Sequence, residues 1–138
     1  MTASLSDVEA SALAAVDEAA IARLLLELLA VPSVTGSAAE SELQHVLARH
    51  LERMDLDVDL WSMNLPELRA HPDFPGSEAP RTEAWGLVAG TPPRGDGPTL
   101  VLQGHVDVVP SGDLARWEGD PFRPGSPGTW CTHEEHAT

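Results

Sequence analysis

The chain has 138 residues, so it has room for one domain at most. Its eight basic residues are all arginine and stand against 22 acidic ones, and the net charge of −14 argues against nucleic acid and membranes as partners. The lack of lysine excludes Schiff-base chemistry, and the single Cys131 excludes an intrachain disulfide and indicates a reducing compartment.

Three helices are predicted in the first part of the chain. A capping box at Ser6–Glu9 opens a short helix. Apolar residues recur at helical spacing over 21–29 and predict a second helix, which Pro32 ends. A second capping box at Ser37–Glu40 opens a third helix that reaches about Arg53.

The most apolar N-terminal stretch, 21–31, does not predict a membrane span. It is short, and Arg23 and Glu27 interrupt it. No basic segment precedes it, which argues against a signal peptide. We therefore expect a cytoplasmic protein.

Three strands are predicted after the helices. Apolar and acidic residues alternate over 56–60, which is typical of a strand with one wet face. The proline-rich residues 62–84 predict a long surface loop with one helical turn after Asn64. A second short strand is expected at 85–89, and the third and most apolar one at 99–103. Helices followed by strands predict an α/β fold.

The strongest functional signal follows the third predicted strand. The apolar run Leu100–Leu102 stops before Gly104, and an imidazole and a carboxylate follow at His105 and Asp107. A buried strand that ends in this way would place a metal-binding imidazole at the carboxyl edge of a sheet, where open α/β folds gather their chemistry. The carboxylate two positions on can hold the far ring nitrogen and raise the basicity of the ligand.

The surroundings of this motif resemble a known family. Gly-His-Val-Asp-Val-Val-Pro-Ser-Gly-Asp at 104–113, Trp-Glu-Gly-Asp-Pro-Phe at 117–122 and Leu-Leu-Ala-Val-Pro-Ser at 28–33 are similar to the M20 family of metal-dependent peptidases and deacylases. Acetylornithine deacetylases and succinyl-diaminopimelate desuccinylases are members of that family. The resemblance covers roughly residues 17 to 124.

The resemblance implies a fold and a site. Residues 1–124 would form the incomplete N-terminal part of an α/β/α zinc-peptidase catalytic domain, with helices and a partial, mostly parallel sheet. His105 would be a zinc ligand and Asp107 the catalytic carboxylate that orients its ring. The family site holds two ions, and cobalt or manganese can replace zinc.

The same resemblance implies a reaction and its partners. The intact family proteins cleave a C–N amide bond in a small N-acyl amino acid or dipeptide-like substrate, using metal-activated water. They are often homodimers, but their dimerisation domain has no counterpart in this sequence. Neither nucleic acid nor a membrane is expected as a partner.

The match to the family fails from Gly125 onward. The family continues after the position of Trp130 with Gly-Arg-Gly and Asp-Met-Lys, whose aspartate bridges the two metals, whereas this chain has a different ending. We therefore expect 125–138 to be a divergent, disordered tail and the chain to be truncated and inactive. Glu134–Glu135 is not taken as the family's general-base pair because it follows His105 too closely, and His133 and His136 are interpreted as solvated residues.

Alternatives stay open at this point. His105 would then be a structural histidine and Asp107 a turn carboxylate. The chain would be a non-catalytic binding or interaction protein, or a non-functional product of a shifted reading frame after Trp130.

Overall fold

The computed structural model describes residues 5–92 and 95–123. The chain divides into two units. The first, here called the helical unit, includes the described residues 5–30 and Arg123, and the second, the 31–122 unit, spans Val31–Phe122. The predicted extent of a single catalytic domain over 1–124 stays a prediction.

The helical unit carries two helices that begin as the sequence predicts. In α1, Asp7–Ala14, the Ser6 amide donates to Glu9 Oε2 at 2.7 Å and the Glu9 amide donates to Ser6 Oγ at 3.4 Å, so the capping box is confirmed. The Ser6 amide and the Ser6 hydroxyl both donate to the Glu9 carboxylate, and these two hydrogen bonds hold the pKa of the Glu9 carboxyl below its usual value. In α2, Glu18–Leu29, Asp17 caps the first turn. Neither helix has a buried residue.

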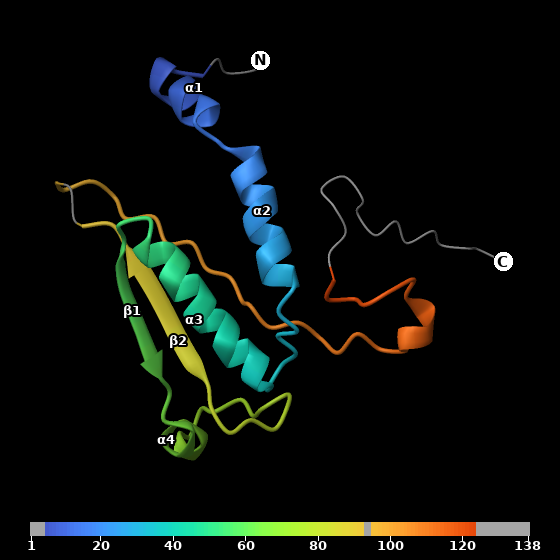
Figure 1. Ribbon diagram of the computed structural model, residues 1–138. Helices are drawn as coiled ribbons and strands as arrows, with labels where there is room; N and C mark the ends of the chain where they lie inside the picture. The colour runs from blue at the N-terminus through green and yellow to red at the C-terminus, as the bar shows by residue number, and fades with distance from the viewer. Residues whose placement is uncertain (1–4, 93–94, 124–138) are drawn as a thin grey trace, which may run out of the picture. The chain divides into compact units, whose positions relative to one another are not determined.

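The 31–122 unit is built on one helix packed against a β-ribbon (Figure 1). The helix is α3, Ala38–Glu52, and the ribbon pairs β1, Asp57–Ser62, with β2, Trp85–Gly90. Leu43 and Ala48 of α3 are buried at 3 and 4 % exposure, because the apolar stripe of the helix faces the ribbon. The alternation in β1 is confirmed, with its acidic residues exposed and Val58 and Leu60 partly buried.

The predicted loop between the strands contains the short helix α4, Leu65–Ala70. Its N-cap Asn64 accepts a hydrogen bond from the Glu67 amide at 3.2 Å, so the helical turn expected after Asn64 is confirmed. Leu65 is buried and adds α4 to the core of the unit.

The sheet differs from the expected partial, mostly parallel one. The two strands of the described chain pair antiparallel. The predicted third strand at 99–103 is wrong, because these residues form no described ladder and Leu100, Val101 and Leu102 are 81, 80 and 85 % exposed. A run that is apolar on both faces is stable as a strand when neighbours pair its edges and layers cover both faces. Among the described residues, no strand pairs with 100–102 and no layer covers its side chains. Its apolar composition alone therefore does not produce a strand.

The second predicted capping box is only half formed. The Ser37 hydroxyl accepts from the Glu40 amide at 3.3 Å, as expected, and begins α3. The Glu40 carboxylate does not return to Ser37; it accepts from the Gly36 amide at 2.6 Å and from Arg81 Nη1 at 3.0 Å. A partly buried ion pair therefore ties the start of α3 to the end of the long loop.

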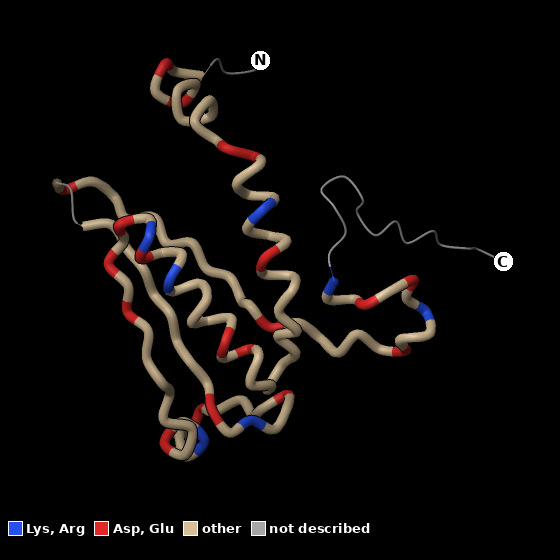
Figure 2. Tube along the Cα trace, in the orientation of Figure 1, with Lys and Arg blue, Asp and Glu red and all other residues tan. Residues whose placement is uncertain are grey.

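Acidic residues occur on α1, α2, α3, α4 and β1, with the arginines scattered among them (Figure 2). In the described part of the chain the excess of negative charge is therefore distributed rather than gathered at one site. No helix of this described part is long and apolar enough to cross a membrane.

Gly36 combines a left-handed backbone with a close approach to main-chain atoms. Its φ is +81°, and a Cβ built there would lie 2.6 Å from the Pro80 carbonyl oxygen. Gly76 has a φ of +102°, but a Cβ there would meet nothing within 4 Å. The two glycines share a backbone conformation and differ in the space around them.

We predict that Gly76→Ala costs about 1 kcal/mol of unfolding free energy, for the left-handed backbone alone. Gly36→Ala should cost roughly 1–3 kcal/mol more, because its methyl group also overlaps main-chain atoms. Urea unfolding of both variants measures the difference. Equal losses would show that the contact with Pro80 does not constrain the fold.

Candidate functional site

The segment that carries His105 and Asp107 is held by residues more than 70 positions earlier in the chain. Val34 and Val108 form an isolated parallel bridge. In it the Val108 amide donates to the Ser33 carbonyl at 3.0 Å, and the Thr35 amide donates to the Val108 carbonyl at 3.0 Å. The motif is therefore positioned by the segment 33–35, and not by a preceding strand at 99–103 as the sequence predicted.

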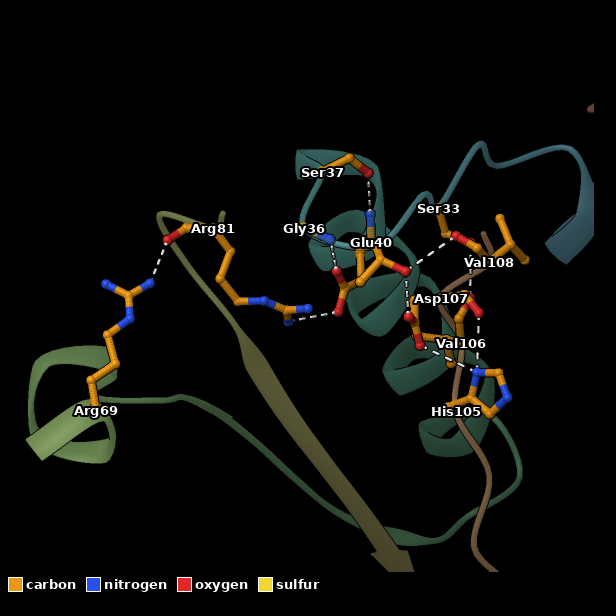
Figure 3. Close-up of polar contacts among 11 residues, drawn as sticks. Ser33, Gly36, Ser37, Glu40, Arg69, Arg81, His105, Val106, Asp107 and Val108 are labelled. Atoms are coloured by element: carbon orange, nitrogen blue, oxygen red, sulfur yellow. Dashed lines mark hydrogen bonds and ion pairs between the residues drawn. The ribbon is translucent and has the colours of Figure 1, made fainter. Parts of the chain in front are cut away.

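Two hydroxyl side chains of the segment 33–35 strengthen this bridge (Figure 3). Ser33 and Thr35 are two residues apart, so in extended backbone they point to the same side. Ser33 Oγ donates to the Val106 carbonyl at 2.8 Å, and Ser33 is 1 % exposed. Thr35 Oγ1 donates to Asp107 Oδ2 at 2.7 Å. We call the segment 33–35 with these bonds the hydroxyl clamp.

His105 contacts Asp107 through one ring nitrogen (Figure 3). Nδ1 lies 3.2 Å from Asp107 Oδ1 and 3.0 Å from the Asp107 carbonyl oxygen. Both partners can only accept at neutral pH, so Nδ1 carries the proton and Nε2 of the neutral ring keeps its lone pair. The His105 side chain is 85 % exposed. The free lone pair is thus available to a ligand.

The Asp107 carboxyl is held in its charged form. The hydrogen bond from the Thr35 hydroxyl is the largest cause that lowers its pKa below the ordinary value, and partial burial opposes it. The contact with His105 lowers the pKa further. At neutral pH the site therefore presents a carboxylate behind the imidazole ring, which raises the basicity of a metal-binding histidine.

Two adjoining cavities border this pair. One of about 550 Å³ is lined by Thr35, Glu78, His105, Asp107 and the two valines that follow. A second of about 250 Å³ shares Thr35, Glu78 and Asp107 with the first and extends along α4 and the loop after it. His105 therefore lies beside a hollow.

The donor atoms of the described residues fit one ligand position of a metal site. A hydrolytic zinc site needs at least three protein ligands. Among residues 5–92 and 95–123, no group of three histidine, cysteine or acidic side chains could hold an ion. The interpretations of Cys131, His133, Glu134–Glu135 and His136, and of the tail 125–138, lie outside the described residues.

The sequence analysis missed the hydroxyl clamp and Glu78. Ser33 lay within the Val-Pro-Ser motif that supported the family resemblance, but no role was derived for it. The available signal was the alternation of hydroxyl and apolar residues at 33–35, which is typical of a short extended segment with one polar side. Nothing in the sequence of the long loop distinguishes Glu78 from its acidic neighbours.

Curated relatives match part of the chain. A succinyl-diaminopimelate desuccinylase of Leptothrix cholodnii is 50% identical over 58 residues, which are 42% of this chain and 14% of the relative. Desuccinylases of Cupriavidus taiwanensis and Methylibium petroleiphilum are 49% and 51% identical over 43 residues, which are 31% of this chain and 11% of each relative.

Over these partial stretches the chain is similar to the succinyl-diaminopimelate desuccinylases. The resemblance to the M20 family is thus confirmed for a part of the sequence, and the relatives are hydrolases. The chain spans about one seventh of the length of the first of them. No protein-family profile matches the chain. No solved structure matches it either.

We predict that the hydrogen bond from Thr35 makes stability depend on pH. Because the folded-state pKa of Asp107 is lowered, its contribution is full above the unfolded-state pKa of about 3.9 and is lost as the pH falls through the folded-state value. Thr35→Val should therefore cost about 1 kcal/mol at pH 7. This difference from the wild type should narrow in acid.

Urea unfolding at pH 7 and at about pH 3, below the ordinary carboxyl pKa, measures this effect. Thr82→Val removes a hydroxyl at an exposed position and is the matched control, for which we expect no pH-dependent change. A loss for Thr35→Val that is the same at both pH values would contradict the assignment to Asp107.

Proposed function

We propose that this chain contributes a metal ligand, His105, to a hydrolase that cleaves a C–N amide bond in a small N-acyl amino acid or peptide-like substrate. The observation that carries the proposal is the geometry of the ring. Nδ1 is engaged by Asp107, while the ring is largely exposed beside a cavity and leaves Nε2 available. Partial identity to desuccinylases supports the reaction class.

The residues of the chain have distinct roles in this proposal. His105 Nε2 would hold the ion, and Asp107 would fix the ring and increase its electron donation. A zinc ion bound there, or cobalt or manganese in its place, would supply an acidified water and would polarise the scissile carbonyl. One ligand position does not complete such a site, so the other ligands and the general base are not assigned.

The surroundings of His105 suit a small substrate. The larger cavity, at about 550 Å³, falls in the usual range for small-molecule sites. Its lining combines apolar Val108 and Val109 with the polar groups of Thr35 and Glu78. Since the relatives are named as desuccinylases, an N-succinyl amino acid is the first substrate to test. A cytoplasmic location stays a prediction.

Zinc titration of the full chain by calorimetry tests the proposal. We expect His105→Ala to weaken zinc binding at least tenfold, because it removes the imidazole that the clamp orients. His71→Ala is the matched control, since His71 is also an exposed histidine but lies on the loop after α4. It should bind zinc as the wild type does.

Two results would contradict the proposed ligand. The first is a wild-type chain that binds zinc no more tightly than His105→Ala. The second is an equal loss in His71→Ala, which would indicate non-specific binding to surface histidines. Release of succinate from an N-succinyl amino acid, measured with and without added zinc, then tests the reaction class separately from the ligand.

A further inference from the structure

We propose that Thr35 is the positioning residue of this site, whose hydroxyl fixes the Asp107 carboxylate and through it the tautomer and direction of the His105 ring. The effect of Thr35 on the ring stands on contacts within the chain. Its consequence for metal binding rests on the proposed function.

The two oxygens of the Asp107 carboxylate have one partner each. Oδ2 accepts from Thr35 Oγ1 at 2.7 Å, and Oδ1 lies 3.2 Å from His105 Nδ1. The terminal torsion of an aspartate side chain is broad, so a free carboxylate would turn easily. The hydrogen bond to Oδ2 selects the rotation in which Oδ1 faces the ring.

Hydrogen bonds of the segment 33–35 hold the Thr35 hydroxyl in place. The Thr35 amide donates to the Val108 carbonyl at 3.0 Å, and the hydroxyl also lies 3.3 Å from that carbonyl oxygen. Ser33 anchors the other side of the segment through the Val106 carbonyl. Because a β-branched side chain has few χ1 rotamers, the backbone of Thr35 determines where its hydroxyl points.

His105 depends on this support because little else orients it. Its side chain is 85 % exposed, and its polar contacts within the described residues are both to Asp107. The main-chain carbonyl of Asp107 is a neutral acceptor, whereas the carboxylate is a charged and therefore stronger one. Loss of the carboxylate contact would leave Nδ1–H with the weaker acceptor and the ring with more freedom.

The test uses the full metal-free chain with ¹⁵N-labelled histidine at neutral pH, and His105→Gln identifies the His105 signals. We expect the wild type to show His105 mainly as the Nδ1–H tautomer. Thr35→Val keeps the shape of the side chain and removes the hydroxyl, so the Nδ1–H fraction should fall. Thr35→Ser keeps the hydroxyl and should restore the wild-type fraction.

Zinc affinity gives a second readout. Loss of a group that orients a metal-binding histidine typically costs 10–100-fold in metal affinity, so we expect Thr35→Val to bind zinc about tenfold more weakly or worse. Ser37→Ala is the control for general destabilisation, because it removes the cap of α3 but no contact of Asp107. It should leave both the tautomer and the affinity as in the wild type.

A double substitution tests whether Thr35 acts through Asp107. Asp107→Ala should lower the Nδ1–H fraction, and Thr35→Val added to Asp107→Ala should change nothing further. The proposal is wrong if Thr35→Val keeps the wild-type tautomer, if Ser37→Ala has the same effect as Thr35→Val, or if the two substitutions act independently. Should Thr35→Val fail to fold, Thr35→Ala removes the same hydroxyl and decides by the same criteria.

The two proposals fail in different ways. If Thr35→Val changes the His105 tautomer but the chain does not bind zinc, the positioning role is retained and the metal function is wrong. A wild-type chain that binds zinc through His105, with a tautomer and an affinity indifferent to Thr35→Val, would retain the metal function and overturn the positioning role.

Discussion

The candidate site depends on the pairing of the hydroxyl clamp with residues 106–108. This contact joins two pieces of extended chain that have few other partners, and its strength comes from main-chain and side-chain hydrogen bonds acting together. The buried Ser33 hydroxyl would be costly without its carbonyl partner. The clamp therefore does two things at once, since it satisfies a buried polar group and sets the backbone from which Asp107 and His105 project.

The elements with local signals could be predicted from the sequence. The capping box at Ser6, the helical periodicity of 21–29 and the alternation in β1 each depend on residues close in the chain, and the structure has all three. Glu40 shows where local signals stop. Its spacing from Ser37 predicts a reciprocal cap, but Gly36 and Arg81 compete for the same carboxylate, and Arg81 lies 41 positions away.

The third predicted strand failed for a related reason. Leu100–Leu102 has the composition of a buried strand, but a strand forms only where neighbouring strands pair with it and other residues cover it. The sequence of the run itself does not show whether such neighbours exist. The structure places the side chains of His105 and Asp107 in contact, and their roles as metal ligand and catalytic carboxylate stay predictions. What the sequence could not show was the support of this pair, because the contact between Thr35 and Asp107 crosses 72 positions and has no periodic signature.

The separation of the clamp from the segment it holds has a consequence for how the chain folds. Closing a loop of some seventy residues carries an entropic cost that adjacent contacts do not have, so nearby helices and turns form more readily than such a junction. Contacts of this kind tend to be acquired late and released early when a protein opens locally. A nascent or partly opened molecule would thus retain α3 and the ribbon while its His105 ring has no fixed orientation.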